Sequence, residues 1–232
     1  MKDYSIFTIF FESALVVQIC IIVLLIQSIV LWSIIYNKYL SLKNVKKAVI
    51  LFEDILLYSK TINKIQAIAE AEPLNPLARL FISSISVIHD KDSNQTGEYS
   101  AEALQEKMRY SMEITYNTII EKMSSQISIL GIISSSAPFI GLLGTVWGIM
   151  GSFALMGTQD QISLMVLAPA LSEALITTAL GLITAIPASI GYNYFIALLS
   201  DINQKIERSM YQIDFIVSSY IHSNYNRSQK KG

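Results

Sequence analysis

The stretch of sequence that decides the fold runs from Met123 to Ser200 and reads MSSQISILGIISSSAPFIGLLGTVWGIMGSFALMGTQDQISLMVLAPALSEALITTALGLITAIPASIGYNYFIALLS. Its 78 residues contain no Lys, Arg or His and two carboxylates, Asp160 and Glu173. Water-soluble domains carry about 25% charged residues, so they do not build segments of this kind. The stretch therefore predicts a membrane hairpin of two spanning helices over 123–200.

The polar cluster GTQDQ places the turn of this hairpin near 157–161, so the two spans cover about 134–156 and 162–194. A further apolar segment, 14–36, has 23 residues without a charge. At 1.5 Å per residue it measures roughly 34 Å, which is enough to cross a hydrocarbon core of about 30 Å. It lacks the basic start and the small-x-small site of a cleaved signal peptide. We expect it to be a retained transmembrane helix.

The charged residues gather outside these apolar stretches. Over the whole chain 52% of residues are hydrophobic and 15% are charged, with a mean hydropathy of +0.46. Residues 37–122 hold eleven Lys or Arg and eleven Asp or Glu, and 201–232 is again polar. The expected fold class is an all-α integral membrane protein, with three transmembrane helices extended by long cytoplasmic helices.

Four features organise the region 37–122. Apolar residues at helical spacing predict a long amphipathic helix over about 40–70 that continues from the first span. The Glu-Pro and Asn-Pro pairs at 72–76 end it, and a second helix follows over 77–88. The polar run 90–97 predicts a turn. A third helix begins near Ala101 and is expected to run on into the membrane hairpin.

Basic residues predict the orientation. The N-terminal segment 1–13 has one, Lys2, the hairpin turn has none, the C-terminal segment has five and the large loop has eleven. Because Lys and Arg favour the cytoplasmic side, we expect 1–13 outside, and 37–122 and 201–232 in the cytoplasm.

The motifs of soluble catalysis are missing from the sequence, which has no P-loop, no nucleophile elbow and no paired catalytic carboxylates. Cys20 stands alone in an apolar run, and His89 and His222 lack Cys or His neighbours. We expect no enzyme activity, no metal or cofactor, and no nucleic-acid partner.

Glu173 is the residue that points to chemistry. It lies about eleven residues into its span, roughly 16 Å along the helix and near mid-bilayer. An ionisable group there marks a functional site by default, and without a cation nearby desolvation favours its protonated form. The alternative is a protonated carboxyl that only holds helices together. Thr177 and Thr184, at i+4 and i+11, share its face, whereas Thr178 is rotated away by about 140°.

Small side chains follow one face of the preceding span, at Ser134, Pro138, Gly141, Thr145, Gly148 and Ser152. Together with Gly144 and Gly181, the glycines are expected to let helix backbones approach closely.

Three other positions in the spans are singled out. For Thr145, a packing hydroxyl and a pore-lining hydroxyl are both open. Pro138 and Pro187 lie within spans, and each is expected to kink its helix.

Two segments, APFIGLLGTVWGIM over 137–150 and APALSEALITTALGLITAIPA over 168–188, resemble the TolQ/ExbB/MotA proton-channel family. The length, the short N-terminal segment, the three spans and the large loop after the first also fit, so the resemblance covers essentially the whole chain. It implies an oligomeric helical bundle in the bacterial inner membrane, with 1–13 in the periplasm. The expected partners are further copies in a homopentamer, a TolR-like (ExbD-like) single-span protein inside the pore, and a TolA-like or TonB-like protein.

The resemblance also implies a function. Proton-motive force would drive a Tol-Pal type motor that serves outer-membrane integrity and cell division. The family pattern carries the proton path onto Glu173, Thr145 and Thr178, whereas the helical face favoured Thr177. Five copies of Glu173 would resist joint ionisation, so a partner helix with its own ionisable group becomes the natural proton carrier.

Other functions stay open from the sequence. The subunit could instead be ExbB-like and energise TonB-dependent import, or it could be a non-conducting membrane scaffold. A stand-alone transporter is disfavoured because the chain has no internal repeat.

Overall fold

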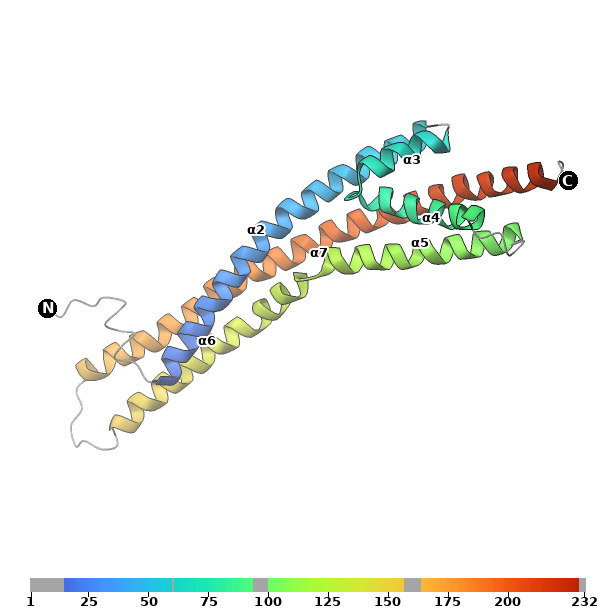
Figure 1. Cartoon of the computed structure of the whole chain (residues 1–232). Coiled ribbons are helices and arrows are strands. Elements are labelled where there is room, and N and C mark those ends of the chain that lie inside the picture. Colours follow the sequence, from blue (N-terminus) through green and yellow to red (C-terminus); the bar gives the residue numbers. More distant parts are fainter. Residues whose placement is uncertain (1–14, 60, 94–99, 157–163, 230–232) are drawn as a thin grey trace. The chain divides into compact units, whose positions relative to one another are not determined.

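A computed structural model describes residues 15–59, 61–93, 100–156 and 164–229, and over these residues the chain is built from helices (Figure 1). In chain order the helices are α2 (Leu15–Tyr58), α3 (Ile62–Ala71), α4 (Pro76–Ser93), α5 (Ala101–Ser124), α6 (Ile127–Met156) and α7 (Leu164–Gln229). Two compact units share them. We call Met1–Lys38 with Gln126–Phe195 the hairpin unit, and Tyr39–Ser125 with Ile196–Gly232 the charged unit.

Three segments of the described chain contain helices long and apolar enough to cross a membrane. They are Leu15–Tyr58, Ala101–Phe153 and Leu171–Ser223. The predicted class, an all-α integral membrane protein with three spanning helices, is confirmed. The turn expected near 157–161 lies outside the described residues, and its flanks are the end of α6 at Met156 and the start of α7 at Leu164.

The predicted single helix over 40–70 is wrong. α2 ends at Tyr58, α3 begins at Ile62, and Thr61 between them has an extended backbone with φ −126° and ψ 125°. The break lets α3 pack on α4 with Ile65 and Ala69 buried. Tertiary packing has here overridden a pattern that is helical on both sides of the break.

The predicted run-on of the third helix into the membrane is also wrong. α5 ends at Ser124, and Gln126 has φ 67°, in the left-handed region. The N–H of Ser125 donates to the Glu121 carbonyl (2.9 Å), and the N–H of Ile129 donates to the Gln126 carbonyl (3.1 Å). A left-handed residue commonly ends a helix, but it is usually Gly, so Gln126 gave no signal in the sequence.

Two other predicted boundaries agree with the structure, and the end of α4 does not. α3 ends and α4 begins around the two prolines, and α5 begins at Ala101. α4 reaches Ser93, beyond the predicted Ile88 and into the expected turn over 90–97, whose remaining residues lie outside the described chain. α7 continues without interruption through position 200 to Gln229, so the second arm of the hairpin and the C-terminal helix are one helix of 66 residues.

Asn75 organises the connection between α3 and α4 in the charged unit. Its side chain is 3% exposed. Its Oδ1 accepts from the backbone N–H of Leu77 (3.1 Å) and so caps α4, while Pro76 occupies the first helical position. Its Nδ2 donates to the carbonyl of Ala48 on α2 (2.9 Å) and to Oε2 of Glu72 (3.1 Å).

Candidate functional site

The two arms of the membrane hairpin approach each other with their backbones where Gly141 of α6 meets Gly181 of α7. A Cβ atom on Gly181 would lie 2.7 Å from the carbonyl oxygen of Ala137 and 3.1 Å from Cα of Gly141. A Cβ atom on Gly141 would lie 3.1 Å from both the Thr177 carbonyl oxygen and Thr178 Cα. Since these neighbours are backbone atoms, only glycine permits this approach. We call this point the glycine crossing.

Two more glycines of α6, Gly144 and Gly148, lie close to both α7 and α2. A Cβ atom on Gly144 would lie 2.5 Å from Cγ2 of Thr177 and 3.5 Å from Cβ of Cys20. A Cβ atom on Gly148 would lie 3.1 Å from Cβ of Ala174. The small side chains of α6 therefore face both α7 and α2 within the hairpin unit.

The glycine crossing brings two hydroxyls into contact. Oγ1 of Thr145 on α6 is hydrogen-bonded to Oγ1 of Thr178 on α7. Thr145 Oγ1 also lies 3.1 Å from the carbonyl oxygens of Gly141 and Ala174, and Thr178 Oγ1 lies 3.2 Å from that of Gly141. Both side chains are half-buried.

Two hydroxyl protons therefore serve several acceptors. Thr145 can donate to Thr178, which then donates to the Gly141 carbonyl. In the reverse order, Thr178 donates to Thr145, which then donates to the Ala174 carbonyl. Each arrangement uses both protons, so the chain of hydrogen bonds can point in either direction.

Glu173 lies on α7, five residues before Thr178. It is half-buried, and its Oε1 atom is shielded from solvent. Its neighbour in the sequence, Ala174, supplies the carbonyl that Thr145 reaches. The backbone carbonyl of Glu173 accepts from the fully buried Thr177 hydroxyl (3.2 Å).

The two threonines of α7 thus have different surroundings. Thr177 places its methyl group against Gly144 and its hydroxyl against the backbone of its own helix. Thr184, on the same face, is 4% exposed and donates to the Leu180 carbonyl (2.9 Å). Thr178 is the one that reaches Thr145 across the hairpin.

Both spans of the hairpin run through their prolines as continuous helices, α6 through Pro138 and α7 through Pro187. α7 contains a further proline, Pro169, that the sequence analysis did not single out. Each proline lacks the N–H that would bond the carbonyl four residues earlier. The bends at Pro138 and Pro187 stay predictions.

Gln27 is a polar residue of the hairpin unit that sequence reasoning missed. Its Nε2 donates to Oγ of Ser136 on α6 (3.3 Å). Its Oε1 is buried and has no hydrogen-bond partner among the described residues. The sequence could have indicated Gln27, because an amide side chain inside an apolar run is expensive in a bilayer. Only charged residues were considered in this run, and Gln27 was therefore missed.

Known proteins are similar to this chain over a region that includes the membrane hairpin. The model of the MotA/TolQ/ExbB proton channel family matches residues 75–208, which is more than half of the chain. The chain belongs to this family. The resemblance predicted from the two motifs is confirmed.

Individual members of the family are about equally similar to the chain. The Tol-Pal system protein TolQ of Pseudomonas aeruginosa is 31% identical over 195 residues, which are 83% of this chain and 84% of that protein. TolQ of Haemophilus influenzae is 32% identical over 79% of this chain and 81% of its own length. The biopolymer transport protein ExbB of Pseudomonas putida is 32% identical over 93% of this chain and 64% of its own length.

Family membership fixes the general activity. The chain is a proton channel subunit and not an enzyme. Membership of the family also implies partners in a motor complex. In the described part of the chain, no three His, Cys, Asp or Glu side chains lie where they could hold a metal ion. The identities of 31% and 32% do not separate TolQ from ExbB.

Proposed function

We propose that this chain conducts protons in a Tol-Pal type motor of the inner membrane. Its N-terminus would lie in the periplasm and its C-terminus in the cytoplasm. Several copies, five in the family pattern, would surround a TolR-like single-span partner and pass movement to a TolA-like protein. The observation that carries the proposal is the Thr145–Thr178 hydroxyl pair at the glycine crossing, with Thr178 on the helix that also bears Glu173.

The hydroxyl pair supplies what a proton relay needs. A proton delivered to one threonine by an ionisable group would displace the hydroxyl proton of that residue to the other, which would pass its own proton to a base on the partner helix. The Gly141 and Ala174 carbonyls orient the hydroxyls but take up no proton. The two orientations described above are the states before and after such a transfer. Each is fully hydrogen-bonded, so neither leaves a costly unsatisfied group in the apolar hairpin.

Glu173 would act as the ionisable group at the end of this relay. A carboxyl group can take up a proton from one side and release it to an acceptor on the other. Because several copies would place several Glu173 carboxyls around one pore, like charges disfavour simultaneous ionisation. A partner helix with its own carboxylate completes the path.

Relatives named TolQ support Tol-Pal type function. Two of the proteins similar to this chain over more than three quarters of both lengths carry the name Tol-Pal system protein TolQ. The alternative is an ExbB-like subunit for TonB-dependent import, supported by a similar identity to ExbB proteins. Co-purification with a TolR-like or with an ExbD-like partner from the same organism separates the two.

Proton flux into liposomes tests conduction itself. The subunit is reconstituted with its single-span partner, and flux is followed with an enclosed pH-sensitive dye. Thr145→Val and Thr178→Val should each abolish the flux, whereas Thr145→Ser and Thr178→Ser, which keep the hydroxyl, should retain it. Glu173→Ala should abolish it while leaving insertion and assembly intact.

A non-conducting scaffold gives a different pattern. It would show no flux in the unmodified complex, and the serine and valine variants would differ only in stability. Full flux in Glu173→Ala would refute the assigned role of this carboxyl.

A further inference from the structure

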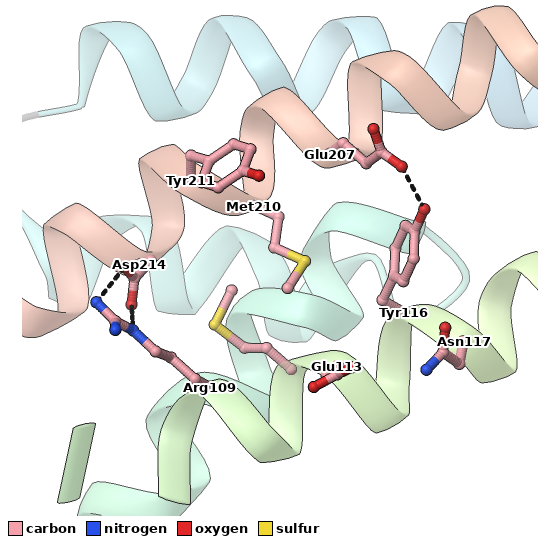
Figure 2. Close-up of a pocket in the computed structure, with 9 residues that line it drawn as sticks. Arg109, Glu113, Tyr116, Asn117, Glu207, Met210, Tyr211 and Asp214 are labelled. Carbon is pink, nitrogen blue, oxygen red and sulfur yellow. Dashed lines mark hydrogen bonds and ion pairs between the residues drawn. The ribbon is translucent and has the colours of Figure 1, made fainter. Parts of the chain in front are cut away.

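The charged unit carries a groove between α5 and α7, with a volume of about 610 Å³ (Figure 2). Its lining follows one face of each helix at the spacing i, i+3, i+4, i+7. The residues are Arg109, Met112, Glu113 and Tyr116 with Asn117 on α5, and Glu207, Met210, Tyr211 and Asp214 on α7. The groove is therefore long in the helix direction, which suits a third helix laid along it.

The groove is acidic. Its three carboxylates face one guanidinium, so its net charge is −2. Arg109 donates to both oxygens of Asp214 at 3.1 Å, and this pairing raises the pKa of Arg109. Glu207 accepts from the Tyr116 hydroxyl (2.7 Å). Glu113 has no ion-pair partner among the described residues, so its charge is open to a cation from another molecule.

Both helices of the groove carry exposed large apolar side chains. Tyr110 is 66% and Ile114 50% exposed on α5, and Tyr211 is 77% and Phe215 74% exposed on α7. Such clusters on an otherwise charged surface mark an interaction site. A lining that combines carboxylates with methionine and tyrosine side chains suits a helix that bears both Lys and aliphatic side chains.

The chain itself contains a helix face of that chemistry. On α2, Leu40, Lys43, Lys47 and Leu51 are exposed and follow one side of the helix. Lys43 lies over the ring of Tyr39, 5.3 Å from its centroid, and Lys47 has no ion-pair partner among the described residues. We call these four residues the basic stripe. It carries a charge of +2, opposite to that of the groove.

We propose that the basic stripe of one copy docks into the α5–α7 groove of the next. This inference rests on the homo-oligomer of the proposed function and adds the surface that joins its copies. The ammonium groups would face Glu113 and the exposed ring of Tyr211, and the Lys stems would cover the methionines of the groove.

The contact would be head-to-tail. The groove and the stripe share no residue, so one copy can use both at once, each toward a different neighbour. A heterologous contact of this kind builds a ring when its rotation closes, as the oligomer of the proposed function requires. The α2 residue next to the stripe, Lys46, is already paired with Asp201 of α7 (2.7 Å), which leaves Lys43 and Lys47 for the neighbouring copy.

Cysteine cross-linking in membranes tests this arrangement cleanly because Cys20 is the single cysteine of the chain. In a Cys20→Ala background, one tagged copy carries Lys47→Cys and a differently tagged copy carries Glu113→Cys. A short bismaleimide should join the two tags. The matched control replaces Lys47→Cys with Lys64→Cys, an exposed position on α3 outside the stripe, and should give no joined product.

A chain with both Lys47→Cys and Glu113→Cys should give a ladder of products that ends at the mass of the full oligomer. An intact oligomer, seen by native mass measurement, without cross-linking between positions 47 and 113 overturns the docking and leaves the proposed function standing. A wild-type chain that is monomeric overturns the docking together with the oligomeric part of the proposed function.

Charge reversal gives a second, independent readout. Glu113→Lys should weaken the oligomer in native mass measurement, and Lys47→Glu in the same chain should restore it. Glu121→Lys, on the same helix but outside the groove, is the control and should leave the oligomer unchanged. Weakening by Glu113→Lys that Lys47→Glu fails to repair contradicts the proposed pairing.

Discussion

Replacing Gly181 with alanine probes the glycine crossing most directly. The new methyl group would lie 2.7 Å from the Ala137 carbonyl oxygen and 3.1 Å from Gly141 Cα. Both neighbours are backbone atoms of α6, so no side chain can rotate away, and the two helices must separate. Gly151 is the matched control, because a Cβ atom there has nothing within 4 Å.

The expected magnitudes have opposite signs. Alanine is favoured over glycine in a helix interior by about 1 kcal/mol, and Gly151→Ala should stabilise the chain by up to that amount. In Gly181→Ala the same gain is set against an overpacking cost of about 3 kcal/mol, the upper part of the usual range, because backbone must move. We expect a net destabilisation of about 2 kcal/mol.

The free energy of unfolding in mixed detergent micelles measures both variants. A second readout is proton flux in liposomes with the single-span partner, which should fall in Gly181→Ala because separating the helices moves Thr178 away from Thr145. If Gly181→Ala is as stable as Gly151→Ala and conducts normally, the two backbones do not cross at this point and the reasoning fails.

Three further predictions concern the charged unit. Asn75→Ala removes the α4 cap and the bond to α2 and should cost about 1–3 kcal/mol, seen as a lower Tm. Asn75→Asp keeps the cap but sets a buried carboxylate oxygen against the Ala48 carbonyl and the Glu72 carboxylate, so its Tm should fall at least as far. Burial, and then the Glu207 carboxylate, raises the pKa of Tyr116. Tyr116 therefore stabilises the fold fully below its unfolded pKa of about 10, and this stabilisation is lost as pH rises through its folded pKa. Tyr116→Phe should flatten the fall in the free energy of unfolding over that pH range. The hydrogen bond from Lys46 lowers the pKa of Asp201. The ion pair therefore stabilises the fold above the unfolded pKa of about 3.9, and this stabilisation is lost as pH falls through the folded pKa of Asp201. Asp201→Asn should remove this pH dependence at a cost under about 1 kcal/mol because the pair is exposed.

The sequence was sufficient for the spans because a bilayer imposes a length and a composition that no soluble segment shares. The helix breaks between Tyr58 and Ile62 and at 125–126 could not be predicted from the sequence, for a physical reason. Neither contains Gly or Pro, the residues that mark breaks. One follows from the packing of α3 on α4, and the other from a left-handed Gln126 whose energy only the folded chain can offset.

The helical-face argument about the threonines shows a second limit. It used Glu173 as the reference direction and therefore ranked Thr177 above Thr178. Both threonines meet α6, Thr177 with its methyl group against Gly144 and Thr178 with its hydroxyl bonded to Thr145. The spacing of a single helix gives which residues share a face, but not which neighbour that face meets.

Close packing and proton transfer need not be rival interpretations of the small residues in this hairpin. Glycine at the crossing brings the α6 backbone close enough for its Gly141 carbonyl to accept from Thr178 of the other helix (3.2 Å) as well as from Thr145 of its own (3.1 Å). In an apolar bilayer a hydroxyl without such an acceptor would be costly. The same glycines that let the helices touch therefore allow two threonine hydroxyls between them to stay hydrogen-bonded in either direction. A methyl group added at the crossing should lower both stability and conduction.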